Sequence, residues 1–443
     1  MIGRFKNWTG TYIYGYLFVK VGINTFYKKY EAVGQENVPY HNKPILFAVN
    51  HQNAFLDPIL TTVVGKQNTY YLTRADIFQK PFLNKLFRSI YMLPIFRQRD
   101  GGDPIEKNKA TFGECHDLLK ENNIIIIFPE GNHNNKKNLR PLKKGIVRIG
   151  YGADDKYDNE LDVKVIPVGL NYSNYSGFQS DFLINFGEPI SLNDYNKQRA
   201  ENESRTINTI TEDIRKGMSK EIIDIRKLDY YDAIHEMLFL FPEQIKDAAG
   251  EKDDSLIAKF RSQKQFISKI ENLIDTDSSV AEQLNEKAKS VIDYTKENGL
   301  KYWLFNQTNY SFLSLFVAIL GLIVGLPFHI YGMLNSYIPY KIPVWFVNSK
   351  IKDITFHGSF KMAFGVLFFK IFWILQTVIV AWLTDDYIWV LYLVTLPVSA
   401  IFSWNYWKLF LKARGKFRYN NLRKTKDFKI VKENREYLLD LIK

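Results

Sequence analysis

The sequence predicts an α/β domain of layered sheet and helices, followed by a charged helical segment and a C-terminal α-helical membrane region. Three observations support this order. Between residues 40 and 190, short apolar runs alternate with helical patterns. Between 191 and about 305, the runs are charged and helical in period. Beyond 310, long apolar runs dominate, and the 443 residues allow two or three structural units.

The first 32 residues precede the predicted α/β domain. An aromatic-rich apolar run extends from Tyr12 to Tyr27, is interrupted by Lys20 and ends before two lysines. It is too short for a confident membrane span and lacks the small-residue cleavage site of a signal peptide. We predict an N-terminal interfacial membrane helix over 1–32, lying in the headgroup region.

The α/β domain is predicted over 33–190. Its apolar runs predict strands near 45–49, 69–73, 91–96, 123–128, 163–170 and 181–186. The patterns between them predict helices near 55–65, 80–90, 104–121 and 144–152. A sheet with helices on its faces accounts for this alternation. The segment 191–305, without a Pro-rich linker, is predicted to be helical and to pack on or beside this domain.

Three uncharged or nearly uncharged runs define a transmembrane region over 306–410. The runs are Ser311–Leu334, Met362–Leu383 and Tyr387–Leu409. Each is long enough to cross a hydrocarbon layer of about 30 Å, so two or three spans are expected. The net charge of +12 suits an anionic partner, and the aromatic residues gathered at both ends of the chain favour a lipid bilayer over nucleic acid.

The end of the first predicted strand carries candidate chemistry. The run Ile45–Val49 is followed by Asn50-His51, and Asp57 comes six positions after the histidine. A histidine at a strand end, with a carboxylate close enough to orient its ring, can act as a general base. The alternative is a turn histidine beside an unrelated helix-capping aspartate.

Two further strand ends are polar. The run Ile124–Phe128 leads into Pro129-Glu130-Gly131, with Lys143 and Lys144 downstream. The strand near 91–96 leads into Arg97 and Arg99, which share a face at period 2 and can form a fork for phosphate. The alternatives are a solvated strand end for the arginines and a surface pair for the lysines. No cluster shows metal-ligand spacing, so no metal is expected.

Taken together, these strand ends resemble the glycerophospholipid acyltransferases, the family of 1-acyl-glycerol-3-phosphate and glycerol-3-phosphate acyltransferases. The family hallmark is Asn-His, four spacer residues and Asp, then Phe-Pro-Glu-Gly-Thr-Arg-Ser. This chain has a five-residue spacer between His51 and Asp57, and Asn132-His133-Asn134 replaces Thr-Arg-Ser. The resemblance covers about 33–190 and includes Arg99, at a position that the family uses to hold glycerol phosphate.

The resemblance implies an O-acyltransferase of phospholipid biosynthesis that acylates 1-acyl-glycerol-3-phosphate (lysophosphatidic acid). His51 and Asp57 are the implied catalytic residues; the implied substrate-binding residues are Arg97, Arg99, Glu130, Gly131, Lys143 and Lys144. Acyl-CoA or acyl carrier protein would be the co-substrate, and no bound cofactor is expected. Glycerol-3-phosphate or another lysolipid is an alternative acceptor, and a non-catalytic lipid-binding membrane protein is the alternative class.

Charge also predicts the topology. The basic tail over 411–443 is expected to be cytoplasmic under the positive-inside rule. An enzyme that uses acyl-CoA needs its catalytic domain on the same side, which three full crossings would forbid. We therefore expect an integral membrane protein in which Ser311–Leu334, broken at Pro327, is re-entrant or two-piece and does not fully cross.

Overall fold

The chain forms two compact units. The computed structural model describes residues 19–64, 67, 69–97, 100–158, 160–384 and 386–443. The first unit comprises Met1–Asp224 together with the distant segment Asp353–Met362, and the second comprises Ile225–Lys352 and Ala363–Lys443.

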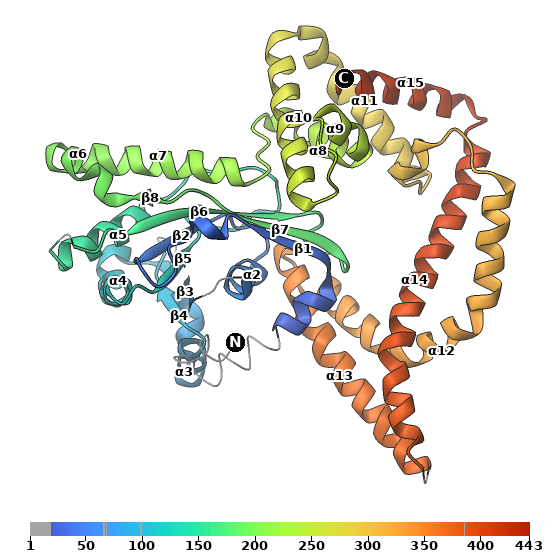
Figure 1. Cartoon of the computed structure of the whole chain (residues 1–443), viewed down its shortest axis with the longest axis horizontal. Helices are drawn as coiled ribbons and strands as arrows, with labels where there is room; N and C mark the ends of the chain where they lie inside the picture. The colour runs from blue at the N-terminus through green and yellow to red at the C-terminus, as the bar shows by residue number, and fades with distance from the viewer. Residues whose placement is uncertain (1–18, 65–66, 68, 98–99, 159, 385) are drawn as a thin grey trace. The chain divides into compact units, whose positions relative to one another are not determined.

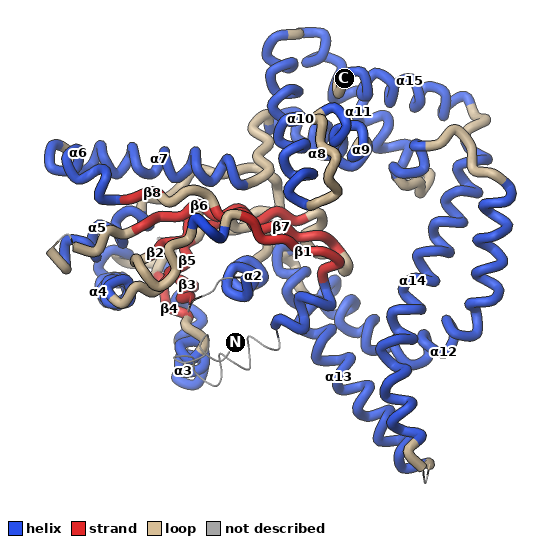
Figure 2. Tube along the Cα trace, in the orientation of Figure 1, coloured by secondary structure: helices blue, strands red, loops and turns tan. Residues whose placement is uncertain are grey.

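The first unit is built on an eight-stranded mixed sheet within the described residues, in the order β1-β7-β6-β2-β5-β3-β4, with β8 pairing with β6 (Figures 1 and 2). The strands are β1 (Tyr27–Val33), β2 (Ile45–Val49), β3 (Thr69–Arg74), β4 (Met92–Ile95), β5 (Ile124–Ile127), β6 (Lys164–Tyr172), β7 (Ser180–Phe186) and β8 (Ile190–Ser191). Strands β6, β2, β5, β3 and β4 run parallel, whereas β7 and β8 run antiparallel to β6. Residues that follow β2, β5 and β4 therefore meet at one edge of the sheet.

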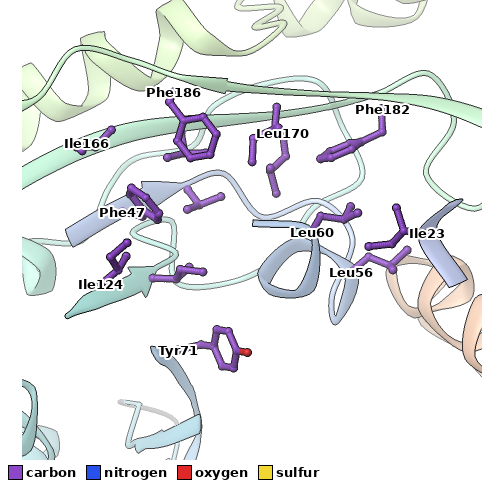
Figure 3. Packing of buried hydrophobic residues seen from close by; sticks show 14 of the residues in the cluster. Ile23, Phe47, Leu56, Leu60, Tyr71, Ile124, Ile166, Leu170, Phe182 and Phe186 are labelled. Carbon is purple, nitrogen blue, oxygen red and sulfur yellow. The ribbon is translucent and has the colours of Figure 1, made fainter. Parts of the chain in front are cut away.

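Both faces of this sheet are buried, which explains the apolar runs without polar alternation. Strand β2 is fully buried and sends Ile45, Phe47 and Val49 to one core and Leu46 and Ala48 to the other. The first core, shown in Figure 3, is closed by the helical residues 19–26 and by α2 (Leu56–Val64). The second core is closed by α4 (Pro104–Lys120), α5 (Gly145–Lys156) and α7 (Glu203–Glu221).

The predicted strands and helices of the α/β domain are all present within a few residues of their expected bounds, the helix near 80–90 being α3 (Pro81–Ser89). The N-terminal prediction is wrong for residues 27–32, which form β1 and pair in parallel with β7. Tyr27 is buried there, because ladder pairing and packing outweigh local helical preference. Helical residues 19–26 bury Ile23 and Phe26 in the first core, and residues 1–18 lie outside the described residues.

The C-terminal boundary of the α/β unit also moves, from 190 to 224. After the short α6 (Asn196–Glu201), α7 packs four apolar side chains against the second core: Ile207, Ile210, Ile214 and Met218. Their spacing of three or four residues places them on one helical face, so the charged residues between them face away from the core. The predicted packing of a charged helical segment on the domain is confirmed for this helix.

The regular elements described in the second unit are helices. It contains α8 (Tyr231–Leu240), α9 (Pro242–Ala248), α10 (Leu256–Thr276), α11 (Ser278–Glu297), α12 (Phe312–Lys350), α14 (Ile388–Leu422), α15 (Lys426–Asp440) and most of α13 (His357–Leu383). Among the described residues, α12, the helical stretch Ile354–Leu383 and α14 are long and apolar enough to cross a membrane, as expected from the three apolar runs. The predicted break at Pro327 is wrong, because α12 continues through it to Lys350. Apolar helices tolerate interior proline where neighbouring groups take up the freed backbone carbonyl.

Candidate active site

His51 is placed by an extension of the β2–β6 ladder. The buried amide of Asn50 donates to the Leu170 carbonyl at 3.1 Å and accepts from the Leu170 N–H at 2.7 Å. A side-chain amide thus replaces one backbone pairing, and the turn begins with His51 at the carboxyl edge of the sheet. The backbone of His51 is then held on both sides, by a carboxylate oxygen of Glu130 on its N–H and by the Asn134 N–H on its carbonyl.

The two side chains that the sequence paired are in contact. His51 Nδ1 lies 2.8 Å from Oδ2 of Asp57, whose side chain is fully buried. The same oxygen accepts the backbone N–H groups of Gln52 and Asn53 at 2.7 and 2.8 Å. These bonds close the five-residue spacer into a tight loop. Because the carboxylate accepts, Nδ1 carries the proton, and Nε2 is the nitrogen available to act as a base.

Aromatic rings fix the plane of the imidazole. The Phe128 ring stacks on that of His51 with centroids 4.1 Å apart, and the His133 ring stands perpendicular to it at 5.5 Å. The His51 side chain is 17% exposed, so part of the ring remains accessible. A ring held by stacking and by a carboxylate keeps one orientation, as a proton acceptor requires.

Glu130 lies beside His51 but bonds to protein groups. One oxygen accepts the His51 N–H at 3.1 Å, and the other accepts Nε of Arg140 at 3.0 Å. Burial raises the pKa of the Glu130 carboxyl, although the bonds from His51 and Arg140 oppose this shift. The predicted substrate-binding residue is thus placed where it joins the ends of β2 and β5.

Gly131 and Lys143 are both exposed at this edge. Gly131 has a positive φ of 73°, which favours glycine, and a side chain there would meet the Lys143 chain at 3.5 Å. The Lys143 N–H donates to the Pro129 carbonyl at 2.7 Å, which holds this exposed lysine beside the turn. Lys144, also exposed, is the N-cap of α5.

Of the predicted arginine fork, only Arg97 lies within the described residues. Arg97 follows β4 in a loop, and its guanidinium makes an ion pair with Asp100 at 2.8 Å. Arg99 lies outside the described residues. Three strand spacings separate β4 from β2, which amounts to about 14 Å between their backbones. Arg97 therefore shares the edge with His51 but is partly neutralised.

Two residues of the site carry no signal that marks them in the sequence. Tyr172, at the end of β6, donates its hydroxyl to Oδ1 of Asp57 at 2.6 Å. Burial, and then the charge of Asp57, hold the pKa of Tyr172 well above its usual value, so the hydroxyl remains a donor. Arg140 neutralises Glu130 from a loop. Tyr172 is distant in sequence from Asp57, and Arg140 lies in an irregular segment. Sequence periodicity predicts neither kind of contact.

Other reactive groups lie elsewhere. Cys115 is fully buried in the second core, and burial raises the pKa of its thiol to about 12, so it is unsuited to act as a nucleophile. The described residues contain no group of three or more His, Cys, Asp or Glu that could hold a metal ion. Among the described residues of this edge, the His51–Asp57 pair is a histidine with a carboxylate placed to orient its ring.

The α/β sheet holds an oriented His–Asp pair at the edge of its parallel strands, an arrangement that can support general-base catalysis. Residues 29–171 match the model of the acyltransferase family. The chain therefore contains a domain of the acyltransferase family, as the sequence motifs predicted.

Individual relatives match over part of their length. Glycerol-3-phosphate O-acyltransferase 1 of Saccharomyces cerevisiae is 36% identical over 83 residues, which is 19% of this chain and 11% of that protein. The chloroplastic 1-acyl-sn-glycerol-3-phosphate acyltransferase BAT2 of Brassica napus is 29% identical over 154 residues, 35% of this chain and 40% of that protein. The solved 1-acyl-sn-glycerophosphate acyltransferase PlsC of Thermotoga maritima has 17% identity and a TM-score of 0.32, covering 46% of this chain and 76% of that one.

Proposed function

We propose that the protein is a glycerolipid O-acyltransferase that transfers a fatty acyl group from an acyl thioester to the free hydroxyl of 1-acyl-glycerol-3-phosphate. The observation that carries this proposal is the His51–Asp57 pair, with Nδ1 bound to a buried carboxylate, inside a domain of the acyltransferase family. Relatives whose names specify glycerol-3-phosphate and 1-acylglycerol-3-phosphate as acceptors support a phosphorylated glycerol acceptor.

The arrangement supports a direct transfer. Nε2 of His51 takes the proton of the acceptor hydroxyl as its oxygen attacks the thioester carbonyl. The carbon–sulfur bond then breaks, and the departing thiolate receives a proton from the imidazolium. Asp57 stabilises the positive ring while it exists, through the 2.8 Å contact to Nδ1. No enzyme nucleophile is needed, because the substrate hydroxyl takes the place that the nucleophilic serine has in a Ser-His-Asp hydrolase.

Charge at the same edge suits a phosphate. Lys143 is exposed and is held beside Gly131. Gly131 directly follows Glu130, which accepts the His51 N–H. An ammonium group there can bind a phosphate oxygen by a charge-assisted hydrogen bond. Arg97 would contribute only after exchanging Asp100 for the ligand, and Lys144 lies at the start of α5.

Two alternatives remain distinguishable. The alternative acceptors are glycerol-3-phosphate and another lysolipid. Between these two, the 36% identity to a glycerol-3-phosphate O-acyltransferase favours glycerol-3-phosphate. A non-catalytic lipid-binding protein would not need the proton-accepting geometry of His51.

The test is thiol release from acyl-CoA and from acyl carrier protein by the detergent-purified full chain and by its His51→Ala variant. Glycerol-3-phosphate, lysophosphatidic acid and a lysolipid with a larger head group are offered in parallel. We expect release that depends on lysophosphatidic acid and falls by at least about 100-fold in the variant. Release that is unchanged by the substitution would remove His51 from its role, and no release from any pair of substrates would favour the binding protein.

The proposed location is an integral membrane protein with its catalytic domain on the cytoplasmic side. Helix α15 packs on the helices that precede the membrane region (Figure 1): Asn434 donates to Ser290 at 2.9 Å, and Lys269 donates to the Ile442 carbonyl at 3.0 Å. The chain before 312 and after 422 therefore lies on one side of any bilayer, which supports an even number of crossings.

The connection between α12 and α13 supports the same topology. Its residues Asp353–Met362 belong to the catalytic unit, so α12 would begin and end on the catalytic side, with α13 and α14 as the two full crossings. At 39 residues, α12 is about 58 Å long, and the three prolines inside it are sites where the kinks needed to enter and leave the same face can form. A membrane-impermeant label at positions 309 and 430 tests this, and labelling of one site from each side would refute it.

A further inference from the structure

A segment from the membrane region is part of the catalytic unit. Asp353–Met362 follows α12 and includes the first turn of α13, yet it groups with the α/β unit and not with the helices on either side of it. Met362 is 7% exposed within the first core. The segment lies far outside residues 29–171, the part of the chain that matches the acyltransferase family.

The segment holds His133, the residue that departs from the family motif. Oδ2 of Asp353 lies 2.7 Å from Nε2 of His133, and the Phe356 ring meets the His133 ring edge-on at 5.2 Å. The other carboxylate oxygen of Asp353 accepts the Thr355 N–H at 3.0 Å, which fixes the carboxylate at the start of its own short helix. The His133 ring also contacts the His51 ring, with centroids 5.5 Å apart. Asp353 is therefore linked to the proposed base through a single side chain.

The segment also contacts the loop that carries Asp57. The Leu56 N–H, at the first residue of α2, donates to Ser359 Oγ at 3.2 Å. Gly358 packs so closely that a side chain there would lie 2.5 Å from the Tyr175 carbonyl oxygen and 3.0 Å from the Asn53 amide. Asn53 in turn donates its N–H to Asp57 at 2.8 Å. The loop that orients the carboxylate is therefore held on one side by this segment.

We propose that Asp353–Met362 is a positioning element of the active site, in which Asp353 orients His133 against His51, and Gly358 and Ser359 fix the loop that carries Asp57. The segment is continuous in sequence with α13, whose first residues it includes. Asp353 and His133 are positioning residues: His133 contacts the ring of the base, Asp353 contacts His133, and neither takes part in proton transfer. This inference rests on the proposed function.

The first test compares substitutions at Asp353 in the full chain, assayed as above. Asp353→Ala removes the partner of His133, and we expect kcat to fall about 10-fold while KM stays within about 2-fold, because the change affects orientation and not binding. Asp353→Asn retains an oxygen for Thr355 and an amide that can donate to His133, so it should recover most of the loss. Ile354→Ala is the matched control, because Ile354 is 54% exposed on the same segment, and should stay within about 2-fold of wild type.

A double-mutant cycle tests whether Asp353 acts through His133 or by destabilising the protein in general. In a His133→Ala background, Asp353→Ala should have little further effect on kcat, since its partner is already absent. Additive losses, or an unchanged kcat in Asp353→Ala when wild type is active, would overturn the inference. A loss of kcat that matches a loss of folded protein and is not restored by Asp353→Asn would also overturn it.

A second measurement does not need activity. Phe55→Cys and Phe356→Cys replace two rings whose centroids lie 5.2 Å apart, and the native Cys115 is buried. A short bifunctional thiol reagent should join the two engineered cysteines, whereas a cysteine at exposed Ile354 paired with Phe55→Cys should react less. Failure of the first pair to cross-link in folded protein would overturn the placement of the segment. If wild type is inactive with every substrate while the pair cross-links, the proposed function fails and the contact stands.

Discussion

Asp57→Asn isolates the charge of the carboxylate from its geometry. The asparagine oxygen can take the place of Oδ2 and accept the same N–H groups, those of Gln52, Asn53 and the His51 ring, at 2.7 to 2.8 Å. Its amide nitrogen would then replace Oδ1 and donate to the Tyr172 hydroxyl, which lies 2.6 Å away in wild type. The bonds to Oδ2 survive in this arrangement, the bond with Tyr172 is kept with its direction reversed, and the negative charge is lost.

The expected cost follows from that lost charge. With charge centres about 4 Å apart and an effective dielectric constant of about 20, the attraction between the carboxylate and the imidazolium is about 4 kcal/mol. Since the imidazolium forms only as the hydroxyl is deprotonated, this attraction lowers the barrier, and its loss should reduce kcat about 1,000-fold.

The assay is thiol release under saturating acceptor, with thermal unfolding as the control for folding. Because Asp57→Asn keeps the bonds, its melting temperature should change much less than that of Asp57→Ala, which leaves two backbone N–H groups unpaired. A variant that keeps more than about a tenth of wild-type kcat would refute the reasoning that Asp57 acts by stabilising the charged ring.

Three further predictions concern the surroundings of this pair. Tyr172→Phe removes a hydrogen bond to the buried carboxylate of Asp57, and it should lower the free energy of unfolding by about 2 kcal/mol, measured by denaturant titration. Burial raises the pKa of Glu130 in the folded protein, so this carboxyl stabilises the fold most at low pH, and its contribution is lost as the pH rises above 4.5. The stability of wild type relative to Glu130→Gln should therefore fall with rising pH, and a parallel dependence in the two proteins would contradict this. Lys143→Ala should raise the KM for a phosphorylated acceptor about 10-fold with little change in kcat, whereas Lys144→Ala, at the start of α5, should have a smaller effect; equal effects would argue against a phosphate contact at Lys143.

The α/β layers could be predicted because their signals are local. Strands such as Ile45–Val49 and Ile124–Ile127 are buried on both faces, so each appears in the sequence as an unbroken apolar run. The predictions failed where a partner distant in sequence decided the structure. Tyr27–Val33 is a strand because β7 pairs with it, and α7 belongs to the first unit because its apolar face matches a core formed by other elements.

By itself, the sequence determined the order of strands and helices between 45 and 186, the three apolar helices and the motif that joins His51 to Asp57. These features depend on periodicity, on length and on residues six positions apart, which the chain carries locally. Only the tertiary structure decided which side chains complete the site. Tyr172 reaches Asp57 across 115 positions and Asp353 reaches His133 across 220, because the sheet and the docked segment bring distant residues together. The pairing of Arg97 with Asp100 was likewise decided in space, where a neighbouring carboxylate binds a guanidinium that the sequence leaves free for phosphate.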